Sequence, residues 1–448
     1  MTCTREEQTR TGEQRSTRWR LFSLKQSFFL FCALVIPCTL FAHFYLQRKP
    51  IYSQRTFPKC THGSASHDTI TPLPGNKSFI IAPYYDDREG KVIRTLGIVH
   101  TELKRLYCYL CCTVETGMHV SEAKIVIHED RFGFPFGLAD IICDEPPNCR
   151  PAYVYLNESP AENITRLTRF EIQNRDRGEF KTNFTVCIST LYGNYSNALQ
   201  FIQTIEMYKL LGAQRVTIYL KNCSRQVEKI LEHYSREGII EVVPWPIHRY
   251  LQVSQKWFYE GDNKEIGYYG QMATLNDCLY KNMYRSRFVL LNDIDEIILP
   301  SGHKTWDNLM ESLQKQNPGV GVFLFEAFAF PQTVVTDGNF SGISSWKQVP
   351  GFDILQHINR EPPKPDIFNG RKMIVDPRKV VQTSVHSVLN SFGNSIKVPL
   401  ETALVHHCRS PQQLNLNKSL YIDDRTIWKY NVSLIRNVNQ VLNQLSLQ

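Results

Sequence analysis

Two aspartates, Asp293 and Asp295, follow the apolar run RFVLLN and are separated by a single isoleucine. If this run is a buried strand, residues two apart point to the same face, so both carboxylates can converge on one hard cation while Ile294 points back into the core. Such a pair can hold a divalent ion that bridges a diphosphate, and Glu296 adds a third carboxylate beside it. A solvated strand end is the alternative interpretation, because an Asp-x-Asp also arises by chance.

Histidines near the C-terminus could complete the oxygen ligands of a manganese-like ion. His386 lies in VVQTSVHSV, and His406 and His407 are adjacent in TALVHHCRS. Neighbours on one strand face opposite ways, so at most one of the adjacent pair can reach a shared site. We take His386 and His407 as candidate metal ligands, with a satisfied structural role as the alternative for each.

Two cations and one turn are candidates for binding phosphate or nucleotide. Lys372 and Arg409 flank the histidine region and could neutralise phosphate, although a lone Lys or Arg is usually a surface charge. In LYGNYSNALQF, Gly193 permits close backbone approach, and the helix expected to follow aims N–H groups outward. This turn lacks G-x-G-x-x-G, and Asn194 is also a glycosylation sequon, so a glycan and a nucleotide would compete for it.

Alternating strands and helices must position these residues. Gly212 and Gly238 stop two of the helices, and Ser224 caps one of them. The β-α-β-α-β-α-β order specifies a mostly parallel sheet covered on both faces, whose sites gather at the carboxyl ends of the strands. The sequence predicts strands over residues 183–191, 215–221, 239–245 and 287–293 and helices over 198–211, 225–237 and 272–284, followed by a helix over 306–316 and strands over 320–328, 372–375, 379–388 and 402–408.

The region from residue 79 to residue 155 has a different pattern. Its apolar stretches, such as FIIAPYY, RLYCYLCC and PAYVYL, are short and β-rich and are separated by turn-forming clusters. No helical period is visible there. These features predict a small β-rich domain that precedes the α/β part.

The N-terminal residues indicate a membrane anchor. Residues 27–46, SFFLFCALVIPCTLFAHFYL, form an apolar stretch long enough to cross a bilayer. The basic residues before it favour a cytosolic N-terminus, although basic residues follow it too. A cleaved signal peptide is the alternative, but the apolar stretch and its leader are long, and no clear small-x-small cleavage site follows.

Glycosylation sequons and cysteines support a secretory compartment. Ten cysteines lie between Cys60 and Cys408, so disulfides are expected, although their pairing cannot be deduced from the sequence. The C-x-x-C from Cys108 to Cys111 has no second pair at zinc-ribbon spacing, which disfavours a zinc site. All sequons follow the apolar stretch, at Asn76, Asn157, Asn163, Asn183, Asn194, Asn222, Asn339, Asn417 and Asn431.

The composition excludes several classes of protein. The chain has 448 residues, of which 42% are hydrophobic and 21% charged, so it is neither disordered nor collagen-like. Its net charge of +8 is spread without a run of five like charges, which gives nucleic-acid binding little support.

Several blocks in a fixed order resemble glycosyltransferase family 92, whose characterised animal members are Golgi β-1,4-galactosyltransferases. The resemblance covers roughly residues 79–409 and implies a GT-A fold with a Rossmann-like mixed sheet, a UDP-sugar donor, Mn²⁺ and inversion at the anomeric carbon. The blocks are IIAPYYDDR, VIRTLGIV, the stretch from LYGNYSNALQF to GIIEVVPW, GQMATLNDCLYKNMYRSRFVLLNDIDEIILP, KMIVDPRKVVQTSVH and ALVHHCR.

This resemblance implies roles for residues of the chain. Asp293 and Asp295 match the family's Asp-x-Asp, and the C-terminal histidine blocks are matched by His386, His407 and Arg409. Cys408 stands where relatives commonly carry Tyr, and Asn292 precedes the first aspartate; neither removes a predicted ligand.

Inverting displacement also requires a carboxylate that takes the acceptor proton. Glu326 is the first candidate for this base and Asp353 the second, although either could be a surface or paired acid. Two other classes of function stay open: a metal-dependent phosphohydrolase and a non-catalytic lumenal carbohydrate-binding protein.

The prediction is therefore a single-pass type II Golgi membrane enzyme with a lumenal catalytic domain, which transfers galactose from UDP-galactose in β-1,4 linkage to a glycan acceptor on a glycoprotein or glycolipid. Its predicted parts are a cytosolic tail (1–26), a transmembrane signal anchor (27–46), a stem (47–75), a β-rich N-terminal domain (76–175), a GT-A-like catalytic domain (176–435) and a C-terminal tail (436–448).

Overall fold

The computed structural model describes residues 64–112, 117–160, 164–363 and 369–447. These residues belong to one compact unit that extends over Pro58–Gln448. The predicted cytosolic tail, membrane anchor and most of the stem lie outside the described residues. Within the described part, no helix has both the length and the apolar character that a membrane crossing requires.

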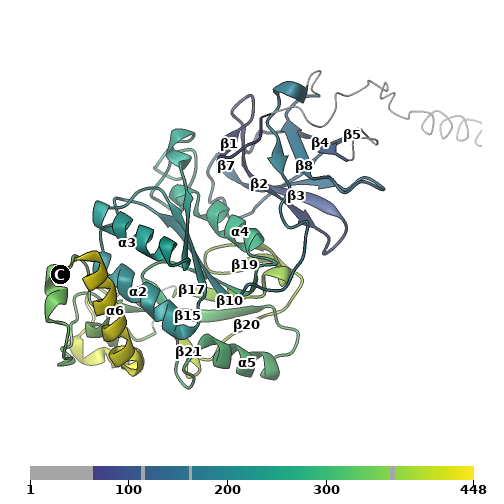
Figure 1. Cartoon of the computed structure of the whole chain (residues 1–448). Helices are drawn as coiled ribbons and strands as arrows, with labels where there is room; N and C mark the ends of the chain where they lie inside the picture. Colours follow the sequence, from purple (N-terminus) through teal and green to yellow (C-terminus); the bar gives the residue numbers. More distant parts are fainter. Residues whose placement is uncertain (1–63, 113–116, 161–163, 364–368, 448) are drawn as a thin grey trace, which may run out of the picture. The chain divides into compact units, whose positions relative to one another are not determined.

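A mixed nine-stranded sheet forms the centre of the C-terminal part (Figure 1). One half is parallel and contains, in spatial order, β12 (Ile240–Pro244), β11 (Arg215–Leu220), β10 (Thr182–Leu191) and β13 (Ser286–Asn292). These are the four strands expected from the β-α alternation, so the parallel half of the sheet is confirmed.

The other half of the sheet mixes strand directions. The strand β17 lies next to β13 and runs antiparallel to it. On its other side β17 pairs with β15, again antiparallel, and β15 pairs in parallel with both β21 and β20. The strand β14 closes the order as the antiparallel partner of β21. The bounds are Arg371–Val375 for β17, Val322–Pro331 for β15, Ala403–Arg409 for β21, Ser395–Lys397 for β20 and Glu296–Pro300 for β14.

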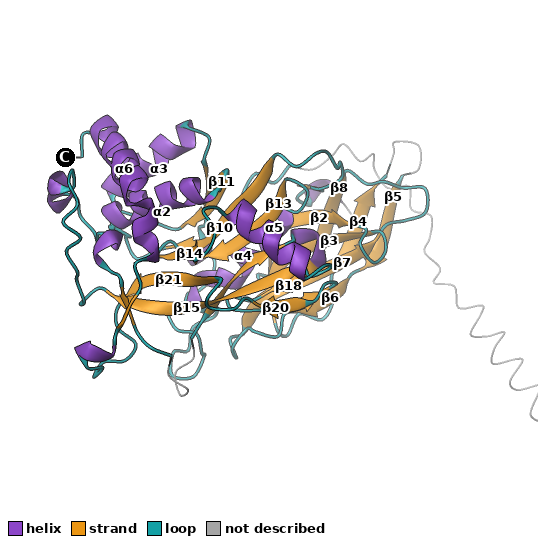
Figure 2. Ribbon diagram, turned by 90° about the horizontal axis from the view of Figure 1, so that it is seen from below, coloured by secondary structure: helices purple, strands orange, loops and turns teal. Residues whose placement is uncertain are grey.

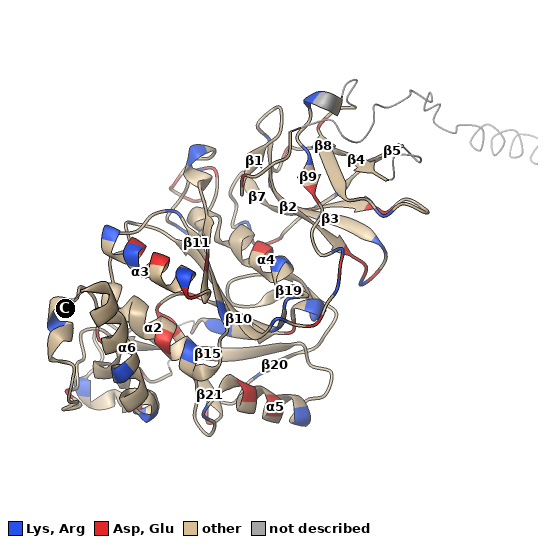
Figure 3. Ribbon diagram, in the orientation of Figure 1, with Lys and Arg blue, Asp and Glu red and all other residues tan. Residues whose placement is uncertain are grey.

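Helices cover this sheet on both faces (Figure 2). One apolar core joins the sheet to α2 (Ala198–Leu211), α3 (Arg225–Arg236), α5 (Trp306–Gln316) and α6 (Asn431–Leu445). A second core, on the opposite face, joins it to α4 (Gln271–Lys281). Acidic and basic residues follow one another along the α3 ribbon in Figure 3. The buried residues of α3, such as Val227 and Ile230, belong to the core.

The N-terminal part consists of two antiparallel sheets, as predicted for a β-rich region. Residues of β2 and β3 share the second core with α4, so this part packs onto the α4 face of the central sheet. The five-stranded sheet has the order β1 (Thr71–Pro72), β2 (Ser78–Asp86), β3 (Val92–His100), β7 (Phe136–Asp144) and β6 (Lys124–Ile127), and the four-stranded sheet has the order β5 (Met118–Glu122), β4 (Tyr107–Cys111), β8 (Tyr153–Asn157) and β9 (Phe170–Glu171).

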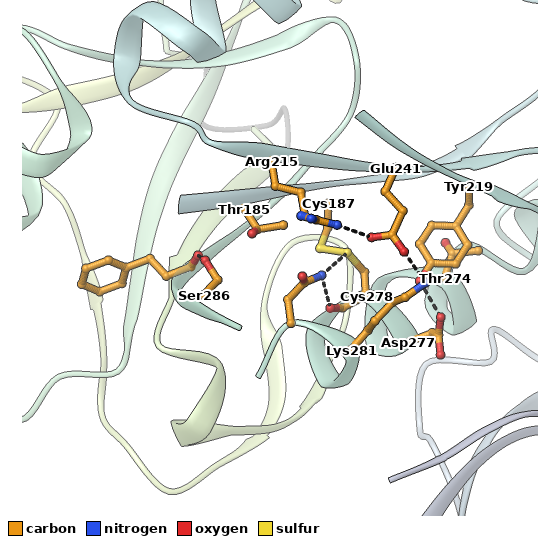
Figure 4. Close-up of a disulfide and its surroundings, with 12 residues drawn as sticks. Thr185, Cys187, Arg215, Tyr219, Glu241, Thr274, Asp277, Cys278, Lys281 and Ser286 are labelled. Atoms are coloured by element: carbon orange, nitrogen blue, oxygen red, sulfur yellow. Dashed lines mark hydrogen bonds and ion pairs between the residues drawn. A yellow bond between two sulfur atoms is a disulfide. The ribbon is translucent and has the colours of Figure 1, made fainter. Parts of the chain in front are cut away.

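Disulfides occur in both parts, which confirms the expectation from the cysteine content. Cys108–Cys143 joins β4 to β7 and so links the two N-terminal sheets, and Cys112–Cys149 lies nearby. Cys187–Cys278 joins β10 to α4 in the C-terminal part (Figure 4). Cys223 and Cys408 are buried free thiols.

The strand predicted over residues 379–388 is instead a hairpin of β18 (Val380–Thr383) and β19 (Val388–Ser391), with His386 in its turn. Its apolar run continues only to residue 381, and the polar residues that follow bend the chain. Two-residue strands β16 (Asn359–Arg360) and β22 (Ile422–Asp423) pair with each other. Short 3-10 helices occupy Ile164–Arg166, Ile247–Arg249, Tyr268–Gly270, Ser344–Gln348, Ile354–Gln356, Pro377–Lys379, Lys418–Leu420 and Thr426–Tyr430.

Helix α6 crosses the expected boundary between catalytic domain and C-terminal tail at residue 435. Its buried residues are Leu434, Val438, Val441 and Leu442, which recur at helical spacing. They belong to the same core as α2, so the chain end packs against the sheet's helical layer instead of forming a tail.

Candidate functional site

The strand order of the parallel half places a candidate site between β10 and β13. The chain builds β10, β11 and β12 outward in one direction and then returns to place β13 on the other side of β10. Loops that leave the carboxyl ends of two such strands diverge to opposite faces, which opens a crevice where ligands bind. Asp293 follows β13 directly, and Tyr192 follows β10.

Asp293 and Asp295 lie in the tight turn between β13 and β14, not on a strand. The predicted strand ends one residue early, at Asn292, because the chain turns back toward Glu296, whose Oε2 accepts a hydrogen bond from the Asp293 N–H at 3.0 Å. Ile294 is 6% exposed, so it points into the core as predicted.

Side chains from three other elements hold the Asp293 carboxylate. Ser189 on β10 donates to its Oδ1 at 2.9 Å, and Gln271, the first residue of α4, donates to the same oxygen at 3.1 Å. The ammonium of Lys372 on β17 lies 2.6 Å from its Oδ2. Asp293 is therefore fixed from β10, α4 and β17 together.

Lys372 lies between two carboxylates. Its Nζ is 2.6 Å from Asp293 Oδ2 and 2.9 Å from Glu296 Oε2, and the lysine side chain is only 2% exposed. A buried ammonium with two such partners compensates their charge and keeps them in place. The sequence predicted Lys372 at this region as a phosphate contact; the structure pairs it with the acids.

His407 on β21 bridges Asp295 and Glu296. Its Nε2 lies 3.1 Å from Asp295 Oδ2, and its Nδ1 lies 3.2 Å from Glu296 Oε1. The adjacent His406 points to the other face, where its Nε2 lies 2.8 Å from the backbone oxygen of His357. The prediction that only one of the two histidines reaches the acids is confirmed.

The charges in this cluster shift the pKa values of its members. Burial alone would raise the pKa of Asp293, but the ammonium of Lys372 outweighs it and holds that pKa below its usual value. Burial alone would lower the pKa of His407, but Asp295 and Glu296 outweigh it and raise that pKa above its usual value. The cluster thus combines three acids with one permanent and one titratable cation.

The donor set fits a hard divalent ion such as Mn²⁺, although no group of three or more His, Cys, Asp or Glu side chains in the described residues is arranged as a metal centre. The side chains of Asp293 and Asp295 are each 34% exposed, so both carboxylates reach solvent. Asp295 and His407 supply an oxygen and a nitrogen 3.1 Å apart, a combination that Mn²⁺ accepts.

His386, predicted as a metal ligand, and Arg409, predicted as a phosphate contact, lie at the edge of this cluster. His386, in the hairpin turn, has its Nδ1 3.0 Å from the backbone oxygen of Arg371, the residue before Lys372. Burial first and the charge of Lys372 second lower the pKa of His386 to about 4, which leaves its imidazole neutral. Arg409 ends β21 and lies close enough to His407 to oppose the protonation of that ring.

The predicted nucleotide turn is where the sequence placed it, between β10 and α2. Gly193 and Asn194 have φ of 70° and 51°, so the chain reverses through two left-handed residues. The backbone N–H of Asn194 faces the side-chain oxygen of Asn222 at 3.5 Å. The turn lies at the carboxyl end of β10, on the same sheet edge as Asp293.

The two candidate bases have different surroundings. Glu326 is half-buried on β15 and accepts a hydrogen bond from Asn369 at 3.3 Å. Asp353 caps the 3-10 helix Ile354–Gln356, where its Oδ1 accepts from Gln203 at 2.7 Å and from the backbone N–H of Leu355 at 3.0 Å. These bonds give Asp353 the role of a paired acid, which was the alternative to its role as a base.

Sequence reasoning missed Ser189 and Gln271 as members of the cluster. Ser189 could have been found, because it lies near the end of the strand that neighbours β13, and ends of adjacent parallel strands meet. Gln271 gave no such signal, since its position depends on the turn that begins α4. Tyr208 was also missed; its hydroxyl donates to the backbone oxygen of Glu296 at 2.7 Å and supports the acidic turn from α2.

The fold and the cluster define a mixed α/β protein with an acidic turn, a buried lysine and a histidine at the reversal point of a parallel sheet. Residues 182–438 match Glycosyltransferase family 92. This match covers more than half of the chain and includes every residue of the cluster. The chain belongs to this family.

Similar proteins of this and related names occur in animals and plants. Beta-1,4-galactosyltransferase galt-1 of Caenorhabditis elegans is 27% identical over 241 residues, which are 50% of this chain and 51% of that protein. Glycosyltransferase family 92 protein F13G3.3 of the same organism is 25% identical over 45% of this chain and 37% of its own. Galactan beta-1,4-galactosyltransferase GALS2 of Arabidopsis thaliana is 24% identical over 54% and 42%. The matches thus span about half or less of these relatives.

Proposed function

We propose that this protein is a metal-dependent, inverting glycosyltransferase of the GT-A type, which transfers galactose from UDP-galactose in β-1,4 linkage to a sugar of a glycoprotein or glycolipid. Family membership supports the reaction class. The names of galt-1 and GALS2 support galactose and the linkage. The β12-β11-β10-β13 order with an acidic turn after β13 supports the GT-A assignment.

The observation that carries this proposal is the contact between Asp295 and His407 beside the Asp293–Lys372 ion pair. Asp295 and His407 carry an oxygen and a nitrogen that suit a divalent ion, and the buried Lys372 keeps Asp293 ionised. All of them lie where a parallel sheet opens a crevice for a nucleotide. A carbohydrate-binding protein that catalyses no transfer has no need for such a cluster.

In the proposed reaction, Asp295 and His407 would hold a divalent metal ion, and such an ion would supply positive charge for the negative charge that develops on the departing UDP. Ser189, Gln271 and Lys372 fix the carboxylate of Asp293, and the exposed part of this carboxylate faces the same crevice. Because these contacts exist before substrate arrives, the carboxylate needs no reorganisation when the donor binds.

The proton of the acceptor hydroxyl requires a base, and we propose Glu326 for this role. Glu326 is half-buried and accepts a hydrogen bond from Asn369, so its carboxylate can still accept a proton from a substrate hydroxyl. The carboxylate of Asp353 instead accepts hydrogen bonds from Gln203 and from the backbone N–H of Leu355 in the helix that it caps. The attack from the face opposite the leaving group then inverts the anomeric carbon.

We further propose a lumenal location in the Golgi, with the protein anchored by residues 27–46. Disulfides persist in oxidising compartments such as the secretory pathway. Cys108–Cys143, Cys112–Cys149 and Cys187–Cys278 fit this assignment, as do the sequons.

The test is release of UDP from UDP-galactose in the presence of Mn²⁺ and a panel of glycan acceptors. The wild-type protein should release UDP and form a galactosylated product, and chelation of the metal should stop both. Asp295→Ala should abolish release while its thermal unfolding stays close to that of the wild type.

The same assay separates the alternative functions. A phosphohydrolase would release inorganic phosphate, and a carbohydrate-binding protein would release neither phosphate nor UDP. If UDP release persists in Asp295→Ala, or if it does not need a divalent ion, the proposed metal role is wrong.

A further inference from the structure

A second cavity lies beside the acidic cluster, on the α4 side of the sheet. It holds about 460 Å³ of empty space when the open solvent at its mouth is included. We call it the aromatic cavity. Its wall is built from the loop between β6 and β7 and from the segment that leads into α4, and includes Asp130, Phe132, Phe136, Trp257, Tyr268 and Gln271.

The aromatic rings in this wall are held in place by one another. Trp257 stacks on Tyr268 with ring centroids 4.3 Å apart and planes 13° apart, and Phe132 meets Trp257 edge-on at 5.7 Å. The hydroxyl of Tyr268 is bonded to that of Tyr192 at 2.7 Å. Rigid aromatic faces with fixed hydroxyls suit a flat ligand that has both an apolar face and polar edges, as a hexose ring has.

Asp130 adds a polar group to the aromatic cavity. Both of its carboxylate oxygens are buried, and neither makes a hydrogen bond of normal geometry. Burial raises the pKa of Asp130, and Ser384 and His128 offset this only in part. A buried acceptor without a partner is costly, so a ligand that donates hydroxyls to Asp130 would stabilise it.

The backbone of this wall is strained. Tyr268 and Tyr269 have φ of 36° and 56°, a region that bulky residues rarely adopt, and Gly270 follows at 69°. Trp245 Nε1 donates to the backbone oxygen of Tyr269 at 2.9 Å and helps to hold this conformation. The strain directs consecutive tyrosines to different cavities: Tyr268 lines the aromatic cavity, and Tyr269 lines a neighbouring one.

These two cavities differ in charge. The neighbouring cavity is lined by Lys221, His248, Arg249 and Lys264, which suit a charged ligand. In the aromatic cavity the carboxylate of Asp130 has no hydrogen-bond partner, and neither do the ring nitrogens of His128. Arg131 already donates to the backbone oxygen of Phe134 at 2.6 Å. A diphosphate is therefore disfavoured there, and a neutral sugar is favoured.

Gln271 connects the aromatic cavity to the acidic cluster. It lines the cavity, and its side chain donates to Asp293 at 3.1 Å and to Ser189 at 2.7 Å. From this continuity, and on the basis of the function proposed above, we infer that the aromatic cavity binds the terminal sugar of the acceptor glycan. The β-rich part, which supplies Asp130 and Phe132, then forms one wall of the acceptor site.

The test compares two variants of the cavity with matched controls in the full-length protein. Trp257→Ala removes an aromatic ring on which a sugar could stack, and Asp130→Asn removes the negative charge of the carboxylate that would accept hydrogen bonds from the sugar. The controls change neighbours that do not line the cavity: Phe258→Ala, at a ring that is 64% exposed, and Glu129→Gln, at an exposed acid. The measurements are the KM for the glycan acceptor and the rate of UDP release without acceptor.

Each cavity variant should raise the acceptor KM about tenfold or more, because an aromatic contact or a hydrogen bond to a charged group is lost. UDP release without acceptor should stay within about twofold of the wild type, and the controls should change neither quantity. An unchanged acceptor KM in both cavity variants overturns the inference. A parallel loss of acceptor-free UDP release also overturns it, since the cavity would then serve the donor.

A failure of the proposed function can be recognised separately. If the wild-type protein releases no UDP from any UDP-sugar, binding of the same glycan panel is measured directly. Binding that is lost in Trp257→Ala and kept in Phe258→Ala supports a sugar site without catalysis. Equal binding by both variants, or no binding by the wild type, overturns the inference.

Discussion

Two clusters of acids and cations in this protein use similar side chains in different surroundings. The closed cluster, in the N-terminal part, consists of Asp86, Arg88, Arg94 and Asp140. The open cluster, at the end of the parallel strands, consists of Asp293, Asp295, Glu296, Lys372 and His407. In the closed cluster the carboxylates of Asp86 and Asp140 are 3% and 1% exposed, whereas Asp293 and Asp295 are each 34% exposed.

The cations differ as well. Arg94 reaches Asp86 at 3.0 Å through Nε and Asp140 at 2.8 Å through Nη1, so one planar guanidinium ties two acids together. Lys372 offers a point charge, and His407 offers a ring that can also bind a metal. Burial and ion pairing make the first cluster structural, while partial exposure leaves the second able to bind a ligand.

The largest expected effect comes from Asp295→Asn in the open cluster. The amide keeps the shape but loses the charge that holds a divalent ion, so UDP release should fall about 10³-fold, equivalent to about 4 kcal/mol of transition-state stabilisation. The free energy of unfolding should change by less than about 1 kcal/mol, because the side chain is partly solvated. The measurements are UDP release with Mn²⁺ and urea unfolding.

The matched change in the closed cluster, Asp140→Asn, should lower the stability of the fold and leave the activity unchanged. It removes one of the two buried counter-charges of Arg94 and should cost about 3–5 kcal/mol of unfolding free energy. UDP release per folded molecule should stay as in the wild type. If Asp140→Asn lowers activity more than Asp295→Asn does, the division of roles between the clusters is wrong.

The sequence predicted the open cluster better than the closed one. Asp293 and Asp295 directly follow an apolar strand, and His407 lies near the end of one, so each carries a local signal for a position at the sheet edge. The partners of Arg94 could not be predicted, since Asp86 and Asp140 meet it only through antiparallel pairing across β2, β3 and β7. Nothing in the local sequence specifies that register.

The same distinction explains where the predicted fold was wrong. The strands β10 to β13 and helices α2 and α5 are long, strongly patterned elements, and their residues were predicted closely. The hairpin around His386 was missed because the polar residues after Val381 fit both an exposed strand and a turn. Part of helix α6 was assigned to a tail although its buried residues recur at helical spacing, because packing against α2 is what makes this short pattern a stable helix.

The open cluster is also supported by a disulfide between two of the elements that hold it. Cys187–Cys278 joins β10, which carries Ser189, to α4, which begins at Gln271, so one covalent bond links two elements that hold Asp293. Cys187→Ala with Cys278→Ala opens a loop of 91 residues and should cost about 2–4 kcal/mol of unfolding free energy. Urea unfolding without reductant measures this loss.

Cys223→Ala is the matched control for this variant, because Cys223 is a free thiol, 7% exposed, in the same sheet region. It should cost about 1 kcal/mol or less. The double variant should also lose activity at a lower temperature than the control. An equal loss of stability in both would mean that the disulfide contributes only as packed volume.

The smallest expected effect is the acid sensitivity of the closed cluster. Burial alone would raise the pKa of Asp86, but Arg88, and after it Arg94, lower that pKa from 3.8 to about 2. Because the folded pKa is depressed, Asp86 stabilises the fold above pH 3.8, and this contribution disappears as the pH falls toward 2. It amounts to about 2 kcal/mol at neutral pH.

Asp86→Asn removes this titration and keeps the side-chain volume. The difference in unfolding free energy between wild type and Asp86→Asn should therefore be largest above pH 5 and should shrink steadily toward pH 2, when both are followed by urea unfolding over about pH 2–7. A difference that is constant over this range would show that Asp86 acts through hydrogen-bond geometry alone.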